Sequence, residues 1–336
     1  MTFFRRPLVF TSYYFLVIFI FVLIAFLTSL LALSMGSVPI SPLEIPELLL
    51  SSSDEITHKI IKDIRLPRVI SGFCVGGMLA LAGCLMQVLL RNPLAEPYIL
   101  GISSGASAFA LFAIVIGISG IWVNFSAFAG AAITVFLVFY LSGLKGKWNP
   151  LRTLLTGVVL AAGWGAVVSF LLSISQVTQI HGMLFWLMGD LSLGVFNPAS
   201  AIVLIICVLF CLFIAKELNL LALGKMSAQS LGVSADKLTY LIYFLSSLLT
   251  ATAVMQAGSI GFIGLIVPHL SRLIVGGDHV ILIPVSVLLG GSLLIISDAL
   301  ARTILAPQQL PVGVLTAMLG VPIFLILLNS INKTQK

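Results

Sequence analysis

The residue types that could carry chemistry are sparse in this chain, and their spacing fits no common catalytic motif. No GxxxxGK[ST] loop is present to cradle a nucleotide, so we do not expect the chain to hydrolyse ATP by itself. The 4 histidines are scattered, without the spacing to carboxylates that a metal site requires. The stretch GISSGAS lacks the GxSxG spacing of a serine nucleophile. We predict a chain that is not an enzyme and binds no metal or cofactor of its own.

Two arginines stand at the start of a long uncharged run, in the stretch DIRLPRVISGFCVGG. Arg65 and Arg68 flank Pro67, which is tolerated in the first turn of a helix. A guanidinium is planar, always charged and able to grip a carboxylate with two parallel hydrogen bonds. Arginines at this place either dock an acidic partner or anchor a helix end at the lipid headgroups, and the residues alone favour the anchor.

Asp190, Asp298 and Arg302 are the main charged residues inside apolar stretches. Asp298 and Arg302 are one helical turn apart, and such a pair is either a local structural bridge or a functional contact. The sequence lacks the buried series of carboxylates that ion-coupled carriers use. We therefore expect the energy for any transport to come from a partner.

The composition of the chain indicates that membrane-spanning helices position these residues. Of 336 residues, 60% are hydrophobic and 8% are charged, whereas soluble domains carry about 25% charged residues. Uncharged runs of about 20 apolar residues recur, which is the length that a bilayer-spanning helix needs. The chain is predicted to be an all-α polytopic membrane protein with a single transmembrane domain over residues 1–336.

About ten spans are expected. The third and the eighth look short or interrupted, and the count would be nine if one of them only dips into the bilayer. The ten segments are 13–35, 69–90, 98–118, 123–144, 151–175, 199–215, 238–257, 260–275, 280–300 and 314–329.

Basic residues predict the orientation, because Lys and Arg near span ends favour the cytoplasmic side. With both termini in the cytoplasm, most of the 17 basic residues fall inside. The net charge of +6 is then a signal of topology, and no basic patch with interleaved aromatics indicates a nucleic-acid partner.

Glycine and proline interrupt two of the expected spans. Pro97 precedes two glycines in RNPLAEPYILGISSGASAF, and three glycines precede Pro268 in QAGSIGFIGLIVPHLSR. Interrupted segments at corresponding places in two halves indicate an inverted-repeat transporter with its pathway near the breaks. Tight helix packing through small residues is the alternative, and the two interpretations are compatible.

Four stretches together resemble the permease subunits of the iron-siderophore, haem and vitamin B12 ABC importers. They are RLPRVISGFCVGGMLALAGCLMQVLLRNPLAEPYILGISSGA, LALGKMSAQSLGV, GFIGLIVPHLSRLIVGGDH and SDALARTILAPQQLPVGVLTAMLGVPIF. The resemblance implies ten spans per subunit in a bacterial inner membrane, and a homodimer with its pathway on the two-fold axis. It also implies two cytoplasmic ATPase subunits, which hold ATP and Mg, and an extracytoplasmic substrate-binding protein.

The resemblance also assigns roles to residues at both faces. It implies that Arg65, Arg68 and Arg302 receive acidic residues of the binding protein on the outer face. On the inner face it implies a gate and a coupling segment, residues 221–233, that sits on the ATPase. The gate residues are Asn92, Leu94, Pro150 and Leu151, and the coupling residues are Leu221, Leu223, Gly224, Ser227, Ala228, Leu231 and Gly232.

Gln309 departs from the family, which commonly has an acidic residue before the LPxG stretch, so contacts near the outer end of the pathway are expected to differ. The expected substrate is a metal chelate, a ferric siderophore or haem and next cobalamin. An ion-driven secondary carrier that acts alone is the alternative function.

Overall fold

The computed structural model describes residues 7–36, 38–50, 56–143, 150–192 and 197–334. Every regular element in these residues is helical, which confirms the all-α prediction. The elements in chain order are α1 (Pro7–Ser34), α2 (Ile45–Leu50), α3 (Ile56–Lys59), the π-helical η1 (Ile60–Arg65), α4 (Leu66–Leu90), the 3-10 helix η2 (Pro97–Leu100), α5 (Ile102–Val115), α6 (Ile121–Gly143), α7 (Pro150–Ile174), α8 (Val177–Met188), α9 (Pro198–Phe213), α10 (Ala215–Ala222), α11 (Lys225–Ser230), α12 (Ala235–Ala257), α13 (Ile263–Val275), α14 (His279–Thr303) and α15 (Val312–Thr334).

Six helices among the described residues are long and apolar enough to cross a membrane. The number rises to seven if α9 and α10, which are bent by 66° relative to each other, form one span. The apolar helices α5 and α13, with 14 and 13 residues, are shorter, as predicted for the third and eighth segments. Each of the ten expected segments contains a helix, whereas the number of membrane crossings stays a prediction.

The sequence prediction misses the short helices α2 and α3 before the second expected span, and α8 between the fifth and sixth expected spans. The 12 residues of α8 are too few to cross a bilayer, so a search for long apolar runs passes over it. Gly189 caps the C-terminal end of α8, and its φ of 78° lies in the left-handed region that favours glycine. A Cβ at this position would lie 2.6 Å from the carbonyl oxygen of Ser259. This close approach positions the residues that follow α8 against the start of α13.

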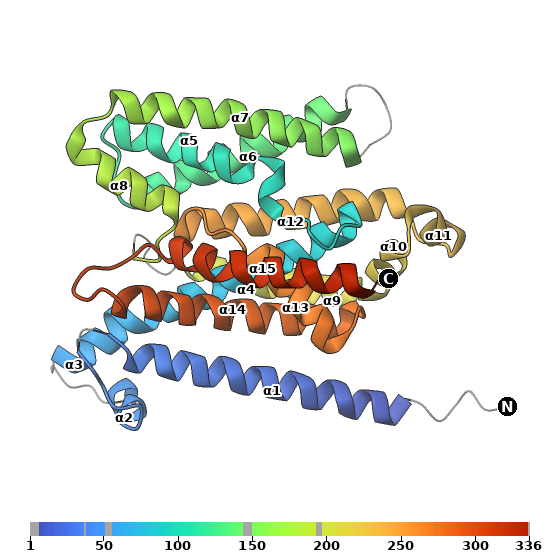
Figure 1. Cartoon of the computed structure of the whole chain (residues 1–336), viewed down its shortest axis with the longest axis horizontal. Helices are drawn as coiled ribbons and strands as arrows, with labels where there is room; N and C mark the ends of the chain where they lie inside the picture. The colour runs from blue at the N-terminus through green and yellow to red at the C-terminus, as the bar shows by residue number, and fades with distance from the viewer. Residues whose placement is uncertain (1–6, 37, 51–55, 144–149, 193–196, 335–336) are drawn as a thin grey trace.

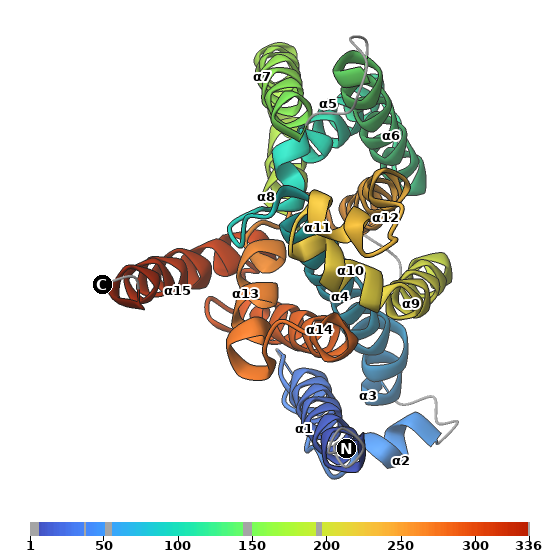
Figure 2. The same cartoon turned by 90° about the vertical axis from the view of Figure 1, so that its right-hand side faces the viewer.

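α4 is the central helix of the bundle and packs against α12, α13 and α14 (Figure 2). Glycines allow two of these helices to approach it closely. A Cβ on Gly76 would lie 2.3 Å from the carbonyl oxygen of Gly290 on α14, and one on Gly83 would lie 1.8 Å from that of Gly264 on α13. Backbones approach this closely only where both helices carry small residues.

The helices run between two ends of the bundle (Figure 1). The first turn of α1, the last turn of α15, and helices α10 and α11 lie at one end, which we call the inner end. Helices α2 and α3 and the connection between α14 and α15 lie at the opposite end, the outer end. α1 therefore begins and α15 ends on the same side of the bundle, while the assignment of that side to the cytoplasm stays a prediction.

The two segments that Gly and Pro interrupt are in contact, although they lie far apart in the sequence. The backbone N–H of Phe262 donates to Glu96 Oε1 at 3.0 Å, and that of Ile260 donates to the Tyr98 hydroxyl at 3.2 Å. Phe262 has a left-handed φ of 71° at the start of α13, where an N–H has no acceptor inside the helix. The breaks of the two halves thus stabilise one another, while the inverted repeat itself stays a prediction.

Candidate functional site

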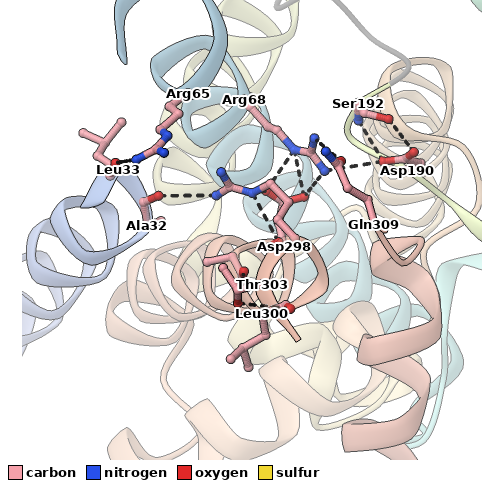
Figure 3. A network of polar contacts seen from close by, with 12 residues as sticks. Ala32, Leu33, Arg65, Arg68, Asp190, Ser192, Asp298, Leu300, Thr303 and Gln309 are labelled. Atoms are coloured by element: carbon pink, nitrogen blue, oxygen red, sulfur yellow. Dashed lines mark hydrogen bonds and ion pairs between the residues drawn. The ribbon is translucent and has the colours of Figure 1, made fainter. Parts of the chain in front are cut away.

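At the outer end, Arg68 on α4 and Asp298 on α14 are the centre of a buried charge cluster (Figure 3). Arg68 Nε donates to the two carboxylate oxygens at 3.0 and 3.1 Å, and Nη2 donates to Oδ1 at 2.8 Å. The two side chains are 10% and 3% exposed, and such charge-assisted hydrogen bonds are stronger away from water. This contact ties the start of α4 to the end of α14.

Arg302 shares the Asp298 carboxylate with Arg68. Its Nε lies 3.0 Å from Asp298 Oδ2, so the pairing across one helical turn that the sequence suggested is present. Arg302 Nη2 also donates to the carbonyl oxygen of Ala32, near the end of α1, at 3.3 Å. The pair is therefore part of a larger cluster that also reaches α1.

A second carboxylate balances the charge of this group, which we call the outer cluster (Arg68, Asp190, Asp298 and Arg302). Asp190 Oδ1 lies 3.6 Å from Arg68 Nη2, and the N–H and hydroxyl of Ser192 hold the Asp190 carboxylate. Two arginines and two aspartates make the cluster neutral in sum. The exposed Gln309 accepts a hydrogen bond from Arg68 Nη1 at 3.1 Å. Its amide thus keeps an acceptor where the resemblance predicts an acidic residue, but it adds no charge.

Arg65 stands apart from the outer cluster. It is 4% exposed, and its guanidinium donates to the carbonyl oxygens of Leu33 and Val38 at 2.7 and 2.5 Å. A Cβ at Gly36 would lie 2.5 Å from Arg65 Nη2, so glycine leaves the room that the guanidinium occupies. Carbonyls at the C-terminal end of a helix lack partners inside it and attract a cation. A carboxylate of a partner protein would reach Arg65 only by displacing these carbonyls.

The structure therefore brings Arg68 and Arg302 together and places Arg65 at the turn after α1. Sequence reasoning did not connect either aspartate with Arg68, because 230 residues separate Arg68 from Asp298 and no local pattern spans that distance. These contacts do not test the docking role of the three arginines, which stays a prediction.

At the inner end, the predicted gate loop begins where α4 ends. Arg91 closes α4 with a left-handed φ of 48°, so the chain turns sharply into Asn92. The side chain of Asn92 accepts a hydrogen bond from the Leu94 N–H at 2.9 Å, which is a local turn typical of asparagine. In the second part of the predicted gate, Leu151 in the first turn of α7 is 65% exposed. Pro150 begins α7, and its side chain lies outside the described residues.

The predicted coupling segment, residues 221–233, covers the end of α10, all of α11 and the turns on either side (Figure 2). Gly224 and Gly232 have φ values of 126° and 86°, so both turns use conformations that favour glycine. Ser227 lies on the exposed side of α11. The segment is therefore a short helical hairpin with defined corners, which suits a fixed contact with a partner.

Side chains of this segment divide into two groups. Leu221 and Ala228 are 5% and 0% exposed, so they pack against the bundle, while their predicted part in coupling stays a prediction. Leu223, Met226 and Leu231 are 71%, 83% and 61% exposed. These three residues, which we call the coupling surface, offer apolar area at the inner end. Met226 was not predicted, and only its exposure in the structure identifies it.

A polar network joins α10 to the turn before α14. Asp278 accepts hydrogen bonds from Asn219 Nδ2 at 2.8 Å and from the Tyr14 hydroxyl at 2.9 Å. Asn219 Oδ1 lies 2.9 Å from the His279 N–H and 2.6 Å from its Nδ1. Because the carboxylate only accepts, it orients the Asn219 amide, and His279 Nδ1 must then carry the proton. The network ties α1, α10 and α14 together at the inner end.

The carboxyl group of Asp278 is the ionisable centre of this network. Burial raises its pKa, but hydrogen bonds from Asn219, the Val280 N–H and Tyr14 outweigh burial, so the pKa lies below its usual value. The network therefore holds the charged form. Among the described residues, no group of His, Cys, Asp and Glu side chains could hold a metal ion.

Comparison with known proteins identifies the family. The sequence profile of the FecCD transport family matches residues 21–330, nearly the whole chain. The chain belongs to the FecCD transport family. This result confirms the resemblance to importer permeases. The members of this family are the permease subunits of transporters.

Relatives and solved structures agree with the FecCD assignment. The hemin transport system permease protein HmuU of Yersinia pestis is 42% identical over 284 residues, which cover 82% of this chain and 84% of the relative. The cobalamin import system permease protein BtuC of Halobacterium salinarum is 41% identical over 278 residues, covering 82% and 74%. A structure described as an inward-facing conformation of a metal-chelate type ABC transporter has a TM-score of 0.83 at 33% identity, covering 94% of this chain and 99% of that chain.

Proposed function

We propose that this chain is the permease subunit of a binding-protein-dependent ABC importer that carries a metal chelate into the cytoplasm. The observation that carries this proposal is the match to the FecCD family over almost the whole chain. The named relatives include permeases for hemin, cobalamin and Fe(3+) dicitrate. A ferric siderophore or haem is the proposed cargo, and cobalamin is the next candidate.

The proposed assembly is a homodimer in the bacterial inner membrane, with two ATPase subunits inside and a binding protein outside. Val159 and Phe170 on α7 and Met318 on α15 are 69%, 61% and 65% exposed, which supports a partner copy or lipid against these helices. ATP and Mg bind to the ATPase subunits in this proposal, and this chain binds neither.

Each end of the bundle has a role in this proposal. At the outer end, carboxylates of the binding protein dock on the arginines, and Arg68 and Arg302 of the outer cluster are 10% and 9% exposed. At the inner end, the coupling surface binds the ATPase. The loop with Asn92 and Leu94 narrows the transport pathway near the dimer axis. The network around Asp278 supports this role, because it connects α10 to α14 and α1.

Reconstitution in liposomes tests the proposal. The permease is purified with an ATPase subunit and a binding protein from the same organism, and uptake of ferric siderophore, haem and cobalamin is measured. We expect one of these chelates to be taken up into the liposomes. This uptake should require the ATPase, the binding protein and ATP on the side of the membrane where the ATPase lies. Uptake by the permease alone, driven by an ion gradient, would show instead that it is a secondary carrier.

A further inference from the structure

A cavity of about 290 Å³ lies at the inner end, between the predicted gate and the coupling segment. Its wall includes Gln87 and Arg91 at the end of α4, Asn92 in the gate loop, and Ala222 at the end of α10. Arg272 at the end of α13 and His279 at the start of α14 also line it. The cavity therefore touches three elements that the proposed function places on the side of the ATPase.

The cavity is positively charged. Arg91 and Arg272 line it, and no aspartate or glutamate does. Within the described part of the chain, neither guanidinium forms a hydrogen bond or an ion pair. The nearby carboxylate of Asp278 already accepts hydrogen bonds from Tyr14, Asn219 and the Val280 N–H. Among the described residues, no carboxylate therefore forms an ion pair with either of the two cations that line the cavity.

The backbone of Arg91 shows that an arginine at this place is unusual. It ends α4 in the left-handed conformation, where glycine is the common residue and most other residues are strained. Its Nη1 lies 3.4 Å from the position that a Cβ on Gly224 would take, so the side chain extends to the coupling segment. Strain at a defined position is a reason to look for a function of the side chain.

The floor of the cavity is polar and incompletely paired. Gln87 and His279 are 3% and 2% exposed, and Gln87 Oε1 and His279 Nε2 have no hydrogen-bond partner in the described residues. Because His279 Nδ1 carries the proton, Nε2 is an acceptor in the neutral ring. An occupant with a negative charge and N–H donors of its own, as an acidic residue of a polypeptide has, would pair with both kinds of group.

We propose that this cavity receives an acidic side chain of the cytoplasmic ATPase subunit, with its carboxylate between Arg91 and Arg272. The inference rests on the proposed function, which supplies the ATPase. A protein fits better than a lipid, because Ala222 and Asn92 line the cavity and join it to the coupling surface and the gate loop. Through this contact, movement of the ATPase would act on the end of α4 and on the gate loop directly.

The test compares binding of the purified ATPase subunit with the wild-type permease, Arg91→Gly and Arg272→Gln in nanodiscs of phosphatidylcholine. Lys237→Gln is the matched control, because it removes one exposed positive charge from the start of α12 outside the cavity. We expect each arginine variant to weaken binding by about tenfold, which is the effect of losing one good charge-assisted contact. Lys237→Gln should leave the affinity within about twofold.

Arg91→Gly separates a binding role from a structural one. Glycine suits the left-handed end of α4, so the unfolding temperature of this variant should equal or exceed that of the wild type, while ATPase binding falls. Equal ATPase affinity of both arginine variants and the wild type would overturn the proposal. A difference in ATPase affinity between the variants and the wild type that appears only when phosphatidylglycerol is added would also overturn the proposal, because the cavity would then bind a lipid headgroup. Absence of ATPase binding to the wild type would instead refute the proposed function.

Discussion

The guanidinium of Arg68 grips the carboxylate of Asp298 with Nε and Nη2, at 3.0 and 2.8 Å, across 230 residues of sequence. The predicted docking arginine is thus already paired inside the chain. A carboxylate of the binding protein that takes Arg68 must share it with Asp298 or replace Asp298. Docking would then act on the contact that joins α4 and α14.

Replacement of Asp298 by asparagine should destabilise the fold. Asp298 compensates the charges of Arg68 and Arg302, whose side chains are 10% and 9% exposed. Breaking a buried ion pair by neutralising one partner typically costs about 3–5 kcal/mol of unfolding free energy. The measurement is unfolding of the purified permease in detergent.

Asp236→Asn is the matched control for this prediction. Asp236 pairs with Lys225, but their side chains are 61% and 37% exposed, so loss of the pair should cost less than about 1 kcal/mol. Equal unfolding of the two variants would show that the outer cluster contributes no more than a surface pair.

The arginines should differ in their effect on docking. Arg68→Gln is expected to slow association of the binding protein, mostly at low salt, because charges at an interface act chiefly on the association rate. Arg65→Gln should instead lower the unfolding temperature, because Arg65 donates to carbonyls in the last turn of α1 and in the loop that follows it. Stopped-flow association over a salt series, with the folded fraction measured for each variant, separates the two. If Arg65→Gln slows association as much as Arg68→Gln and leaves the unfolding temperature unchanged, the prediction is wrong and Arg65 also docks the binding protein.

The membrane setting and the helical segments are predictable from sequence because run length and apolar composition determine which segments can lie in a bilayer. Helix α8 and the bend between α9 and α10 are not predictable in this way. α8 is too short to appear as an apolar run, and its end depends on the approach of Gly189 to Ser259, which only the folded chain defines.

The candidate site shows the same division. Motifs identify Arg68, Arg302 and the coupling segment as candidates, because each lies in a stretch that resembles the importer permeases. They cannot show that Leu221 faces inward while Met226 faces outward, because the choice depends on how α10 and α11 pack. They also cannot pair Arg68 with Asp298, since two helices from distant parts of the chain must first assemble.

The coupling surface should bind the ATPase through apolar contact. Met226→Ser removes an 83% exposed side chain and should weaken ATPase binding by about 1–2 kcal/mol without changing the unfolding temperature. Ala228→Leu is the contrasting variant, because Ala228 is fully buried and a larger side chain should lower stability by about 1–3 kcal/mol. ATPase binding by calorimetry and unfolding in detergent give the two readouts. Unchanged binding of Met226→Ser would remove Met226 from the interface.

Stability should depend on pH through Asp278. Its pKa lies below the usual value of 3.8, so the carboxylate contributes stability above the unfolded-state pKa, and this is lost as pH falls through the lower folded-state pKa. The wild type should therefore be more stable than Asp278→Asn at pH about 5, and this difference in unfolding temperature should shrink as pH is lowered to about 3. Unfolding temperatures of both proteins over this range check the prediction. A constant difference at all pH values would contradict it.

The gate assignment predicts contact between two copies. Leu94 follows Pro93 in a turn that cannot extend α4, so in a dimer it can approach the axis. Cysteine at Leu94 in both copies, in a background without the native cysteines, should cross-link in a nucleotide-dependent way. Cysteine at Ile64, which is 62% exposed near the outer end, is the control and should not. Absence of cross-linking at Leu94 in every nucleotide state of a folded dimer would exclude it from the gate.

The contact between the two interrupted segments has a consequence for biosynthesis. The ribosome makes Glu96 and Tyr98 long before it makes Ile260 and Phe262, whose N–H groups they accept. During that interval the insertion machinery or water must satisfy these side chains, because an unpaired polar group is costly in lipid. The first half of the chain therefore reaches its final shape only after the second half has entered the membrane. Two separately expressed halves should accumulate only when they are made in the same cell.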